Sequence, residues 1–128
     1  MTRAPDWRSH PGAPLRGTRV CALADLPPDN GREVVFGAAD YPLRIAVFRF
    51  GDTARAYVNR CPHFGIPFEC APGVFSVHDA PGGGRQVLCP HHAALFDLDD
   101  GRCVDGPGLG SRLCAVPLEV VDGVIRIA

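Results

Sequence analysis

The sequence has no long apolar run, no excess of either charge and little of the 3.6-residue apolar periodicity that marks amphipathic helices. No apolar run approaches the roughly 18 residues of a membrane span, so no such segment is expected. With 13 basic and 14 acidic residues the formal net charge is −1, which argues against a nucleic-acid or membrane-surface partner. Arg3 and Arg8 are not followed by an apolar segment, so no secretory signal is predicted and a cytoplasmic location, with reduced cysteines, is expected.

Turn-forming residues, in contrast, are abundant, with 15 Gly and 13 Pro among 128 residues. Between them, short apolar and β-branched segments predict strands at 18–23, 32–38, 43–50, 54–59, 73–78, 85–88, 116–121 and 124–127. Asp122-Gly123 is a preferred hairpin turn, and a longer glycine-rich turn at 79–84 is expected between two paired strands. This pattern predicts an all-β fold, either an antiparallel barrel or a sandwich.

The N-terminal residues differ from the rest in composition. Residues 1–17 contain several Pro and Gly and no periodic apolar pattern, which predicts a loose arm over the surface. Trp7 is the one residue that could pin this arm, and the sequence leaves that point open. Residues 18–128 are expected to form a single domain, because their number suits one hydrophobic core.

Two short motifs combine the residue types that bind metals in proteins. The first is Cys61-Pro62-His63, and the second is Cys89-Pro90-His91-His92. Two thiolates and two imidazoles hold either a tetrahedral zinc ion or a [2Fe–2S] cluster with Cys on one iron and His on the other. A C2H2 zinc finger groups its two Cys and its two His separately, whereas each motif here supplies one of each, and each Cys-Pro favours a turn. The arrangement favours the cluster, with structural zinc, or unrelated core cysteines and surface histidines, as alternatives.

The residues that follow the two motifs extend the pattern. The second motif continues as Ala93-Ala94-Leu95-Phe96-Asp97, with Gly101 and Gly106-Pro107 further along, and the first continues as Phe64-Gly65-Ile66-Pro67-Phe68. From about Val20 to the C-terminus the chain resembles the Rieske iron–sulfur family. The resemblance implies a Rieske-like antiparallel β barrel or sandwich with two cluster-binding loops. It also implies a [2Fe–2S] cluster with Cys61 and Cys89 on the inner iron and His63 and His92 on the outer iron.

Some residues near the motifs allow more than one interpretation. His91 is an alternative ligand to His92, although its use would break the Cys-x-x-His spacing. Ala93 stands where the family usually has Gly, which puts a positive φ there in doubt. The acidic residues Asp97, Asp99 and Asp100 are interpreted as a solvated turn, with steering of a basic partner as the alternative.

The other cysteines and histidines are given no metal-binding role. Cys21, Cys70, Cys103 and Cys114 are interpreted as small buried hydrophobic residues. Cys70 is of most interest among them, because it follows the first motif closely. His10 and His78 are interpreted as ordinary surface residues, since neither has a Cys or His companion nearby in the sequence.

Four positions indicate which branch of the family the chain resembles. High-potential members carry Ser and Tyr at the positions of Ala94 and Phe96, and both hydroxyls donate hydrogen bonds to cluster sulfurs. They also join their two loops by a disulfide at the positions of Ile66 and His91. Because this sequence has none of these features, it resembles the low-potential, ferredoxin-type branch.

The resemblance implies a one-electron carrier, rather than an enzyme, that passes electrons from a flavin reductase to a ring-hydroxylating or similar oxygenase. An accessory subunit like the small subunit of nitrite reductase is the alternative. A Rieske oxygenase also needs a 2-His-1-carboxylate iron site, and no His follows His92 in this sequence. The expected contact surface for redox partners is an apolar collar around the two histidine ligands, formed by Pro62, Phe64, Pro67, Pro90 and Leu95.

Overall fold

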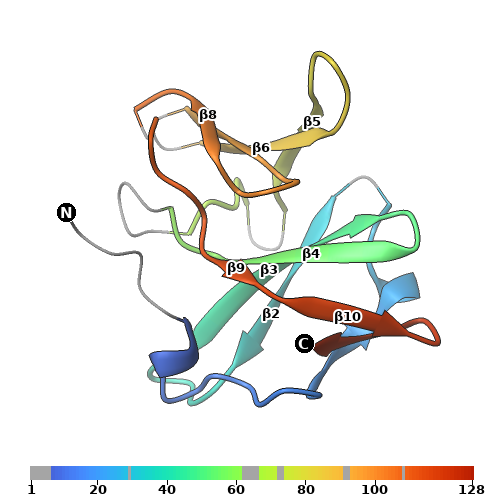
Figure 1. Ribbon diagram of the computed structural model, residues 1–128. Coiled ribbons are helices and arrows are strands. Elements are labelled where there is room, and N and C mark those ends of the chain that lie inside the picture. Colours follow the sequence, from blue (N-terminus) through green and yellow to red (C-terminus); the bar gives the residue numbers. More distant parts are fainter. Residues whose placement is uncertain (1–6, 29, 62–66, 72–73, 91–92, 108) are drawn as a thin grey trace.

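The computed structural model of the chain describes residues 7–28, 30–61, 67–71, 74–90, 93–107 and 109–128. The described chain is nearly all β-structure in antiparallel sheets, which confirms the predicted fold class (Figure 1). Two short 3-10 helices, η1 (Trp7–Ser9) and η2 (Leu23–Asp25), complete the set of elements. None of the helices in the described ranges is long and apolar enough to cross a membrane.

The strands form three sheets (Figure 1). One contains, in spatial order, β1 (Arg19–Ala22), β11 (Val124–Ile127) and β10 (Leu118–Val121). A second contains β2 (Gly31–Phe36), β3 (Leu43–Phe50), β4 (Thr53–Val58) and β9 (Ala115–Val116). The third contains β5 (Ser76–Asp79), β6 (Arg85–Cys89), β7 (Ala94–Asp97) and β8 (Cys103–Asp105).

Strand β3 separates two hydrophobic cores. Successive side chains of a strand point to opposite faces of its sheet. Accordingly, Ala46 and Phe48 belong to one core, while Ile45 and Val47 belong to the other. All four are at most 1% exposed, so this apolar run is buried on both faces. We name the core that contains Ala46 and Phe48 the first core, and it also contains residues of the third sheet. The core that contains Ile45 and Val47 is the second core.

The hairpins show how local sequence determined part of this fold. The turn between β10 and β11 is formed by Asp122 and Gly123, both with positive φ, as the Asp-Gly pair predicts. The predicted pairing on either side of the glycine-rich turn is also present, as β5 and β6. Strands β7 and β8 were not predicted, because each has only three or four residues and alternation over so short a stretch is a weak signal.

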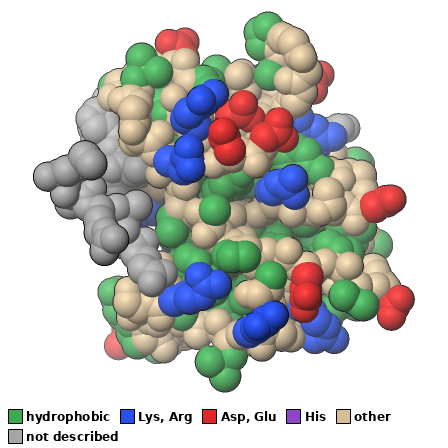
Figure 2. All heavy atoms as spheres, viewed as in Figure 1, with side chains coloured by type: hydrophobic (Ala, Val, Ile, Leu, Met, Phe, Trp, Pro, Cys, Tyr) green, Lys and Arg blue, Asp and Glu red, His purple; other side chains and the backbone are tan. Residues whose placement is uncertain are grey.

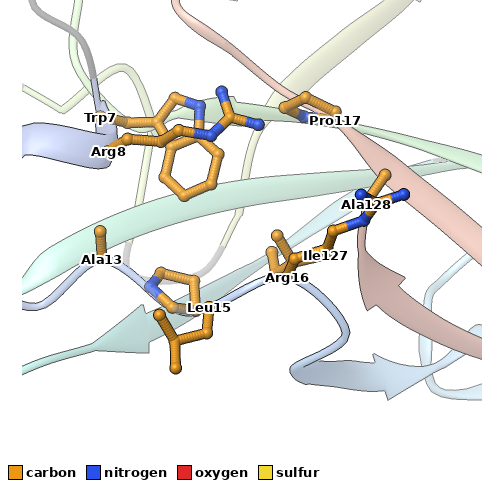
Figure 3. A pocket seen from close by; sticks show the side chains of 9 residues that line it. Trp7, Arg8, Ala13, Leu15, Arg16, Pro117, Ile127 and Ala128 are labelled. Atoms are coloured by element: carbon orange, nitrogen blue, oxygen red, sulfur yellow. The ribbon is translucent and has the colours of Figure 1, made fainter.

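The N-terminal segment differs from the loose arm expected from its composition. Within the described residues of this segment, Trp7 is only 5% exposed and packs into the second core. The Gly17 N–H donates a 2.7 Å hydrogen bond to the Ile127 carbonyl. Burying an indole removes a large apolar area from water, which offsets the cost of ordering the segment. A cavity of about 530 Å³ lies beside Trp7, lined also by Arg8, Leu15 and Ile127 (Figure 3).

Candidate metal centre

Cys61 lies just beyond the end of β4 and begins the first motif. Its side chain is fully buried in the first core. The backbone before it is hydrogen-bonded to two other parts of the chain. The Val58 N–H donates to the Cys114 carbonyl at 2.8 Å, and the Asn59 N–H donates to the Arg44 carbonyl at 2.8 Å. Strand β4 therefore delivers the cysteine to a defined place in the core.

Cys89 is the last residue of β6 and is also fully buried in the first core. It is paired with Ala94 of β7, so residues 90–93 form the whole connection between these two strands. Ala93, within that connection, has a φ of 58°. A positive φ was in doubt here, because the family usually has Gly where this chain has Ala93. Ala93 nevertheless adopts it, despite the steric cost of this conformation for an L-residue.

The fold places the two predicted sulfur ligands in one core, although Cys61 follows β4 of the second sheet and Cys89 ends β6 of the third. The remaining predicted ligands and their neighbours lie outside the described residues, namely His63, His92, the alternative ligand His91, Pro62, Phe64 and Ile66. The assignment of the histidine ligands therefore stays a prediction, and only the sulfur half of the candidate site is described.

The surroundings of Cys61 and Cys89 suit an iron–sulfur cluster. Both lie among buried apolar side chains that include Ala94, Phe96 and Leu113. No disulfide joins any of the described cysteines, so both sulfur atoms retain the capacity to bind a metal. Soft thiolate ligands select iron–sulfur clusters, zinc or Cu(I), so these two residues fit the inner side of a [2Fe–2S] cluster.

The two positions that carry hydroxyl donors in high-potential relatives are both fully buried. Ala94 and Phe96 alternate with half-buried neighbours along β7 and point into the first core. Their side chains have no hydroxyl to offer, so neither donates a hydrogen bond to a group bound by the cysteines of that core.

A polar network joins the two ends of the first loop, by which we mean the segment between Asn59 and Phe68 that carries Cys61. Asn59 is 3% exposed and lies two residues before Cys61. Its Oδ1 accepts a 3.0 Å hydrogen bond from the Phe68 backbone N–H, on the far side of the loop. Its Nδ2 donates to the Glu33 carboxylate at 2.6 Å. The loop therefore begins and ends at positions that are bonded to each other.

Arg44 extends this network. Its guanidinium forms ion pairs with Glu33, at 2.8 Å between Nε and Oε2, and with Glu69, the residue after Phe68. The hydrogen bond to Glu33 raises the pKa of the Arg44 side chain. This network was not predicted, because Glu33 and Arg44 fall within strands, where a charged residue is normally expected to face solvent.

Tyr57 links the second sheet to the third. Its hydroxyl donates a buried 2.7 Å hydrogen bond to the Leu98 carbonyl, just beyond β7. Burial of the phenol raises the pKa of Tyr57 above its ordinary value. Because Tyr57 lies on β4, shortly before Cys61, and Leu98 follows the second motif, this bond helps to fix the two motifs relative to each other.

The other four cysteines only partly match the prediction that they are buried. Cys21 and Cys103 are buried, and burial raises the pKa of the Cys21 thiol. Cys114 is half-buried, whereas Cys70 is exposed, with its Sγ donating to the Val74 carbonyl at 3.3 Å. For Cys70 the prediction was wrong, because the chain reaches the surface at Cys70 and Ala71, two residues after the buried Phe68.

His10 also differs from the surface residue expected. Its ring is half-buried and stacks on Tyr41 with 4.3 Å between ring centroids. Its Nδ1 accepts a 2.8 Å hydrogen bond from the Gly12 N–H. His78 is exposed, as expected, and its ring bonds to the Ser76 hydroxyl.

The acidic residues after β7 form a turn. The Asp97 carboxylate accepts a hydrogen bond from the Asp99 N–H at 3.0 Å, and the Asp100 carboxylate accepts one from the Arg102 N–H at 2.9 Å. Figure 2 shows acidic and basic side chains gathered together on the face that carries β8. These bonds agree with the solvated-turn interpretation, because two of the three carboxylates accept hydrogen bonds from backbone N–H groups of the turn itself.

Comparisons with known proteins agree with this geometry. A sequence model of the Rieske [2Fe-2S] domain matches residues 17–121. Apoptosis-inducing factor 3 of Mus musculus and of Homo sapiens is 34% identical over 92 residues, which is 72% of this chain and 13% of each relative. The chain therefore spans about an eighth of the length of the curated relatives that it matches.

Solved structures of similar size also match. The ferredoxin of carbazole 1,9a-dioxygenase from Nocardioides aromaticivorans is 25% identical, with a TM-score of 0.65, over 89% of this chain and 98% of the ferredoxin. A Mycobacterium tuberculosis protein assigned as an NADH-dependent nitrite reductase small subunit is 29% identical, with a TM-score of 0.62, over 89% of this chain and 96% of that one. Together with the buried cysteine pair, these matches show that the chain belongs to the Rieske [2Fe-2S] domain family, which confirms the family, fold and cofactor predicted from the sequence.

Proposed function

We propose that this chain is a one-electron carrier whose [2Fe–2S] cluster is bound by Cys61, His63, Cys89 and His92. The observation that carries the proposal is the burial of both cysteines in one core, each at the start of a motif that contains a histidine. When bound, such a cluster accepts and donates single electrons. The chain supplies two thiolates on the water-excluded side, and the two following loops supply the imidazoles.

Serine variants test the ligand assignment. Cys61→Ser and Cys89→Ser should each abolish the cluster, measured as iron, acid-labile sulfide and the electron paramagnetic resonance signal of the reduced protein. Cys103→Ser is the matched control, because Cys103 is buried in the same core but lies outside both motifs. Retention of the cluster in either ligand variant, its loss in the control, or zinc in place of iron would each contradict the assignment.

The proposed partners are a flavin reductase as electron donor and a ring-hydroxylating or similar oxygenase as acceptor. The similarity over nearly the whole length of the carbazole 1,9a-dioxygenase ferredoxin supports this choice. An accessory role like that of a nitrite reductase small subunit is the second candidate, supported by the similarity to the Mycobacterium tuberculosis protein. A diffusible carrier should support turnover by an added oxygenase without co-purifying with it, whereas a subunit should co-purify with the large subunit of a nitrite reductase.

The proposal also holds that the chain turns over no substrate by itself and acts in the cytoplasm. A cluster with four protein ligands leaves no open iron position for oxygen or substrate, unlike a catalytic metal site. Of the described histidines, His10 stacks on Tyr41 and His78 bonds to the Ser76 hydroxyl. Oxygen consumption by the isolated reduced protein, coupled to conversion of an aromatic substrate, would contradict this part.

A further inference from the structure

The buried side chain of Asn59 is hydrogen-bonded at both of its polar atoms. Its oxygen accepts from the Phe68 backbone N–H at 3.0 Å, and its nitrogen donates to the Glu33 carboxylate at 2.6 Å. A side-chain amide offers one acceptor and one donor group, whereas an ionised aspartate only accepts and an apolar residue of similar shape does neither. The two partners together therefore select asparagine at this position.

The groups that Asn59 joins are themselves fixed in the fold. Arg44 of β3 holds the Glu33 carboxylate, with 2.8 Å between Nε and Oε2, and its backbone carbonyl accepts the Asn59 N–H at 2.8 Å. At the other end, the Phe68 side chain is fully buried in the first core, with its ring centroid 5.4 Å from that of Phe75. The amide thus connects the second sheet to a residue anchored in the core.

The bond from Phe68 to Asn59 closes the first loop at its base. The two residues are nine positions apart, and Cys61 and the proposed ligand His63 lie between them in the sequence. A protein can open locally at a lower free energy than global unfolding requires, most easily where few bonds hold a segment. Because the Cys61 side chain is fully buried, a chelator reaches a metal bound there only after such an opening.

We infer that Asn59 is a positioning residue, which closes the first loop at its base and so holds Cys61 in place against the cluster. The inference rests on the proposed function. Asn59 acts through the loop and not on the cluster, since its two polar side-chain atoms are bonded to Phe68 and Glu33. Its loss should therefore make the loop open more often without removing a ligand.

Asn59→Ala and Asn30→Ala test the inference as a pair. Asn30 is the matched control, because its amide also bonds to the backbone of a buried phenylalanine of the first core. Its Nδ2 donates to the Phe75 carbonyl at 2.7 Å, and its Oδ1 accepts from the Phe75 N–H at 3.1 Å. Phe75 lies beyond the first loop, so both variants lose amide hydrogen bonds but only Asn59→Ala loses the closure of the loop.

The readout is the rate at which the cluster-loaded protein loses its visible absorbance to an added iron chelator. In Asn59→Ala this rate should rise about tenfold over the parent protein, because an unsatisfied buried hydrogen-bonding group changes an equilibrium by about that factor. The rate should also depend little on low concentrations of urea, because local opening exposes little surface. Asn30→Ala should unfold at lower urea than the parent protein but bleach at nearly the parent rate.

A parent-like rate in Asn59→Ala, or equal rates in the two variants, would overturn the inference. A rate in Asn59→Ala that rises with urea as steeply as global unfolding would also overturn it, since Asn59 would then act only on the stability of the fold. If Asn59→Ala does not fold, Asn59→Ser takes its place with the same expectations. The visible spectrum of the parent protein separates these results from a failure of the proposed function, in which the unmodified chain would bind no Rieske cluster.

Discussion

Gly106 packs directly against the backbone of Ala93 in the second loop. A Cβ atom at position 106 would lie 2.7 Å from the Ala93 carbonyl oxygen and 2.9 Å from the Ala94 Cα. These are backbone atoms, which cannot turn aside as a flexible side chain would. The segment after β8 therefore supports the loop that begins at Cys89 by an approach that only glycine permits.

Gly106→Ala should accordingly destabilise the second loop and the cluster. Gly110→Ala provides the control, because Gly110 has nearly the same φ, 90° against 91°, but no atom within 4 Å of its added Cβ. Both variants bear the cost of a positive φ, and only Gly106→Ala adds a steric clash, typically about 1–3 kcal/mol. Urea unfolding followed by cluster absorbance should show the larger loss in Gly106→Ala. Equal losses would contradict the supporting role.

Tyr57→Phe should lower the free energy of unfolding by about 1–3 kcal/mol, because it leaves the buried Leu98 carbonyl without its hydrogen bond. Tyr41→Phe is the control, since Tyr41 is 60% exposed. Urea unfolding at pH 8 measures both. A loss in Tyr41→Phe as large as that in Tyr57→Phe would mean that the buried bond is not the cause.

The same residue predicts a dependence of stability on alkaline pH. Burial raises the pKa of Tyr57 in the folded protein above the value of about 10 expected in the unfolded chain. Above pH 10 the unfolded chain therefore binds fewer protons at this residue than the folded one, so stability falls as pH rises. Tyr57→Phe should lack this part of the alkaline loss. Identical pH profiles of unfolding between pH 8 and 11 would contradict it.

The sequence sufficed for those parts of the fold that depend on local chemistry. Asp122-Gly123 predicts its own hairpin, because few other pairs adopt two consecutive positive φ angles. Cys61 and Cys89 could be singled out because metal-binding motifs join unusual residue types at short spacing. The family matches confirm the fold and the cluster that these motifs imply.

The parts of the fold and of the site that could not be predicted depend on contacts between residues that are distant in the sequence. The link from Asn59 to Phe68 joins positions on either side of a loop, and an isolated Asn gives no sign of such a partner. The sequence singled out Trp7 as a residue that could pin the N-terminal segment, but its burial became clear only from its packing in the second core. Ala93 shows the opposite case, in which the tertiary setting, including Gly106, imposes a backbone conformation that the local sequence disfavours.

The missing hydroxyl donors lead to a prediction about the reduction potential. With alanine and phenylalanine at positions 94 and 96, the potential should lie near the bottom of the Rieske range, at about −150 mV. The double variant Ala94→Ser with Phe96→Tyr should raise it, because both side chains point into the core that holds the two cysteines and would donate to the more negative reduced cluster.

Ala46→Ser is the control for this experiment, because it buries a hydroxyl in the same core from strand β3 of the second sheet. Its potential should stay close to that of the parent protein. A clearly positive potential in the unmodified protein, measured by voltammetry, would show that backbone donors or burial outweigh the missing hydroxyls.

The last prediction concerns the collar expected around the two histidine ligands. Of its members, Pro90 is exposed and Leu95 is half-buried, while Pro62 and Phe64 lie outside the described residues. A small apolar patch beside the ligand loops suits a brief encounter between redox proteins, whose interfaces are among the smallest. Pro90→Ser and Leu95→Thr should therefore slow reduction by a flavin reductase, measured by stopped flow, and leave the cluster spectrum and the potential unchanged.

Val121→Thr is the matched control, because Val121 is an apolar residue that is 52% exposed on β10, in a sheet that carries neither ligand cysteine. Its rate should equal that of the parent protein. If the collar instead serves only to exclude water, the potential or the lifetime of the cluster would change in Pro90→Ser and Leu95→Thr while the rate of reduction did not. Unchanged rates in both collar variants would thus exclude this surface as the point of electron entry, and an equal slowing in Val121→Thr would show that the effect is not local to the loops.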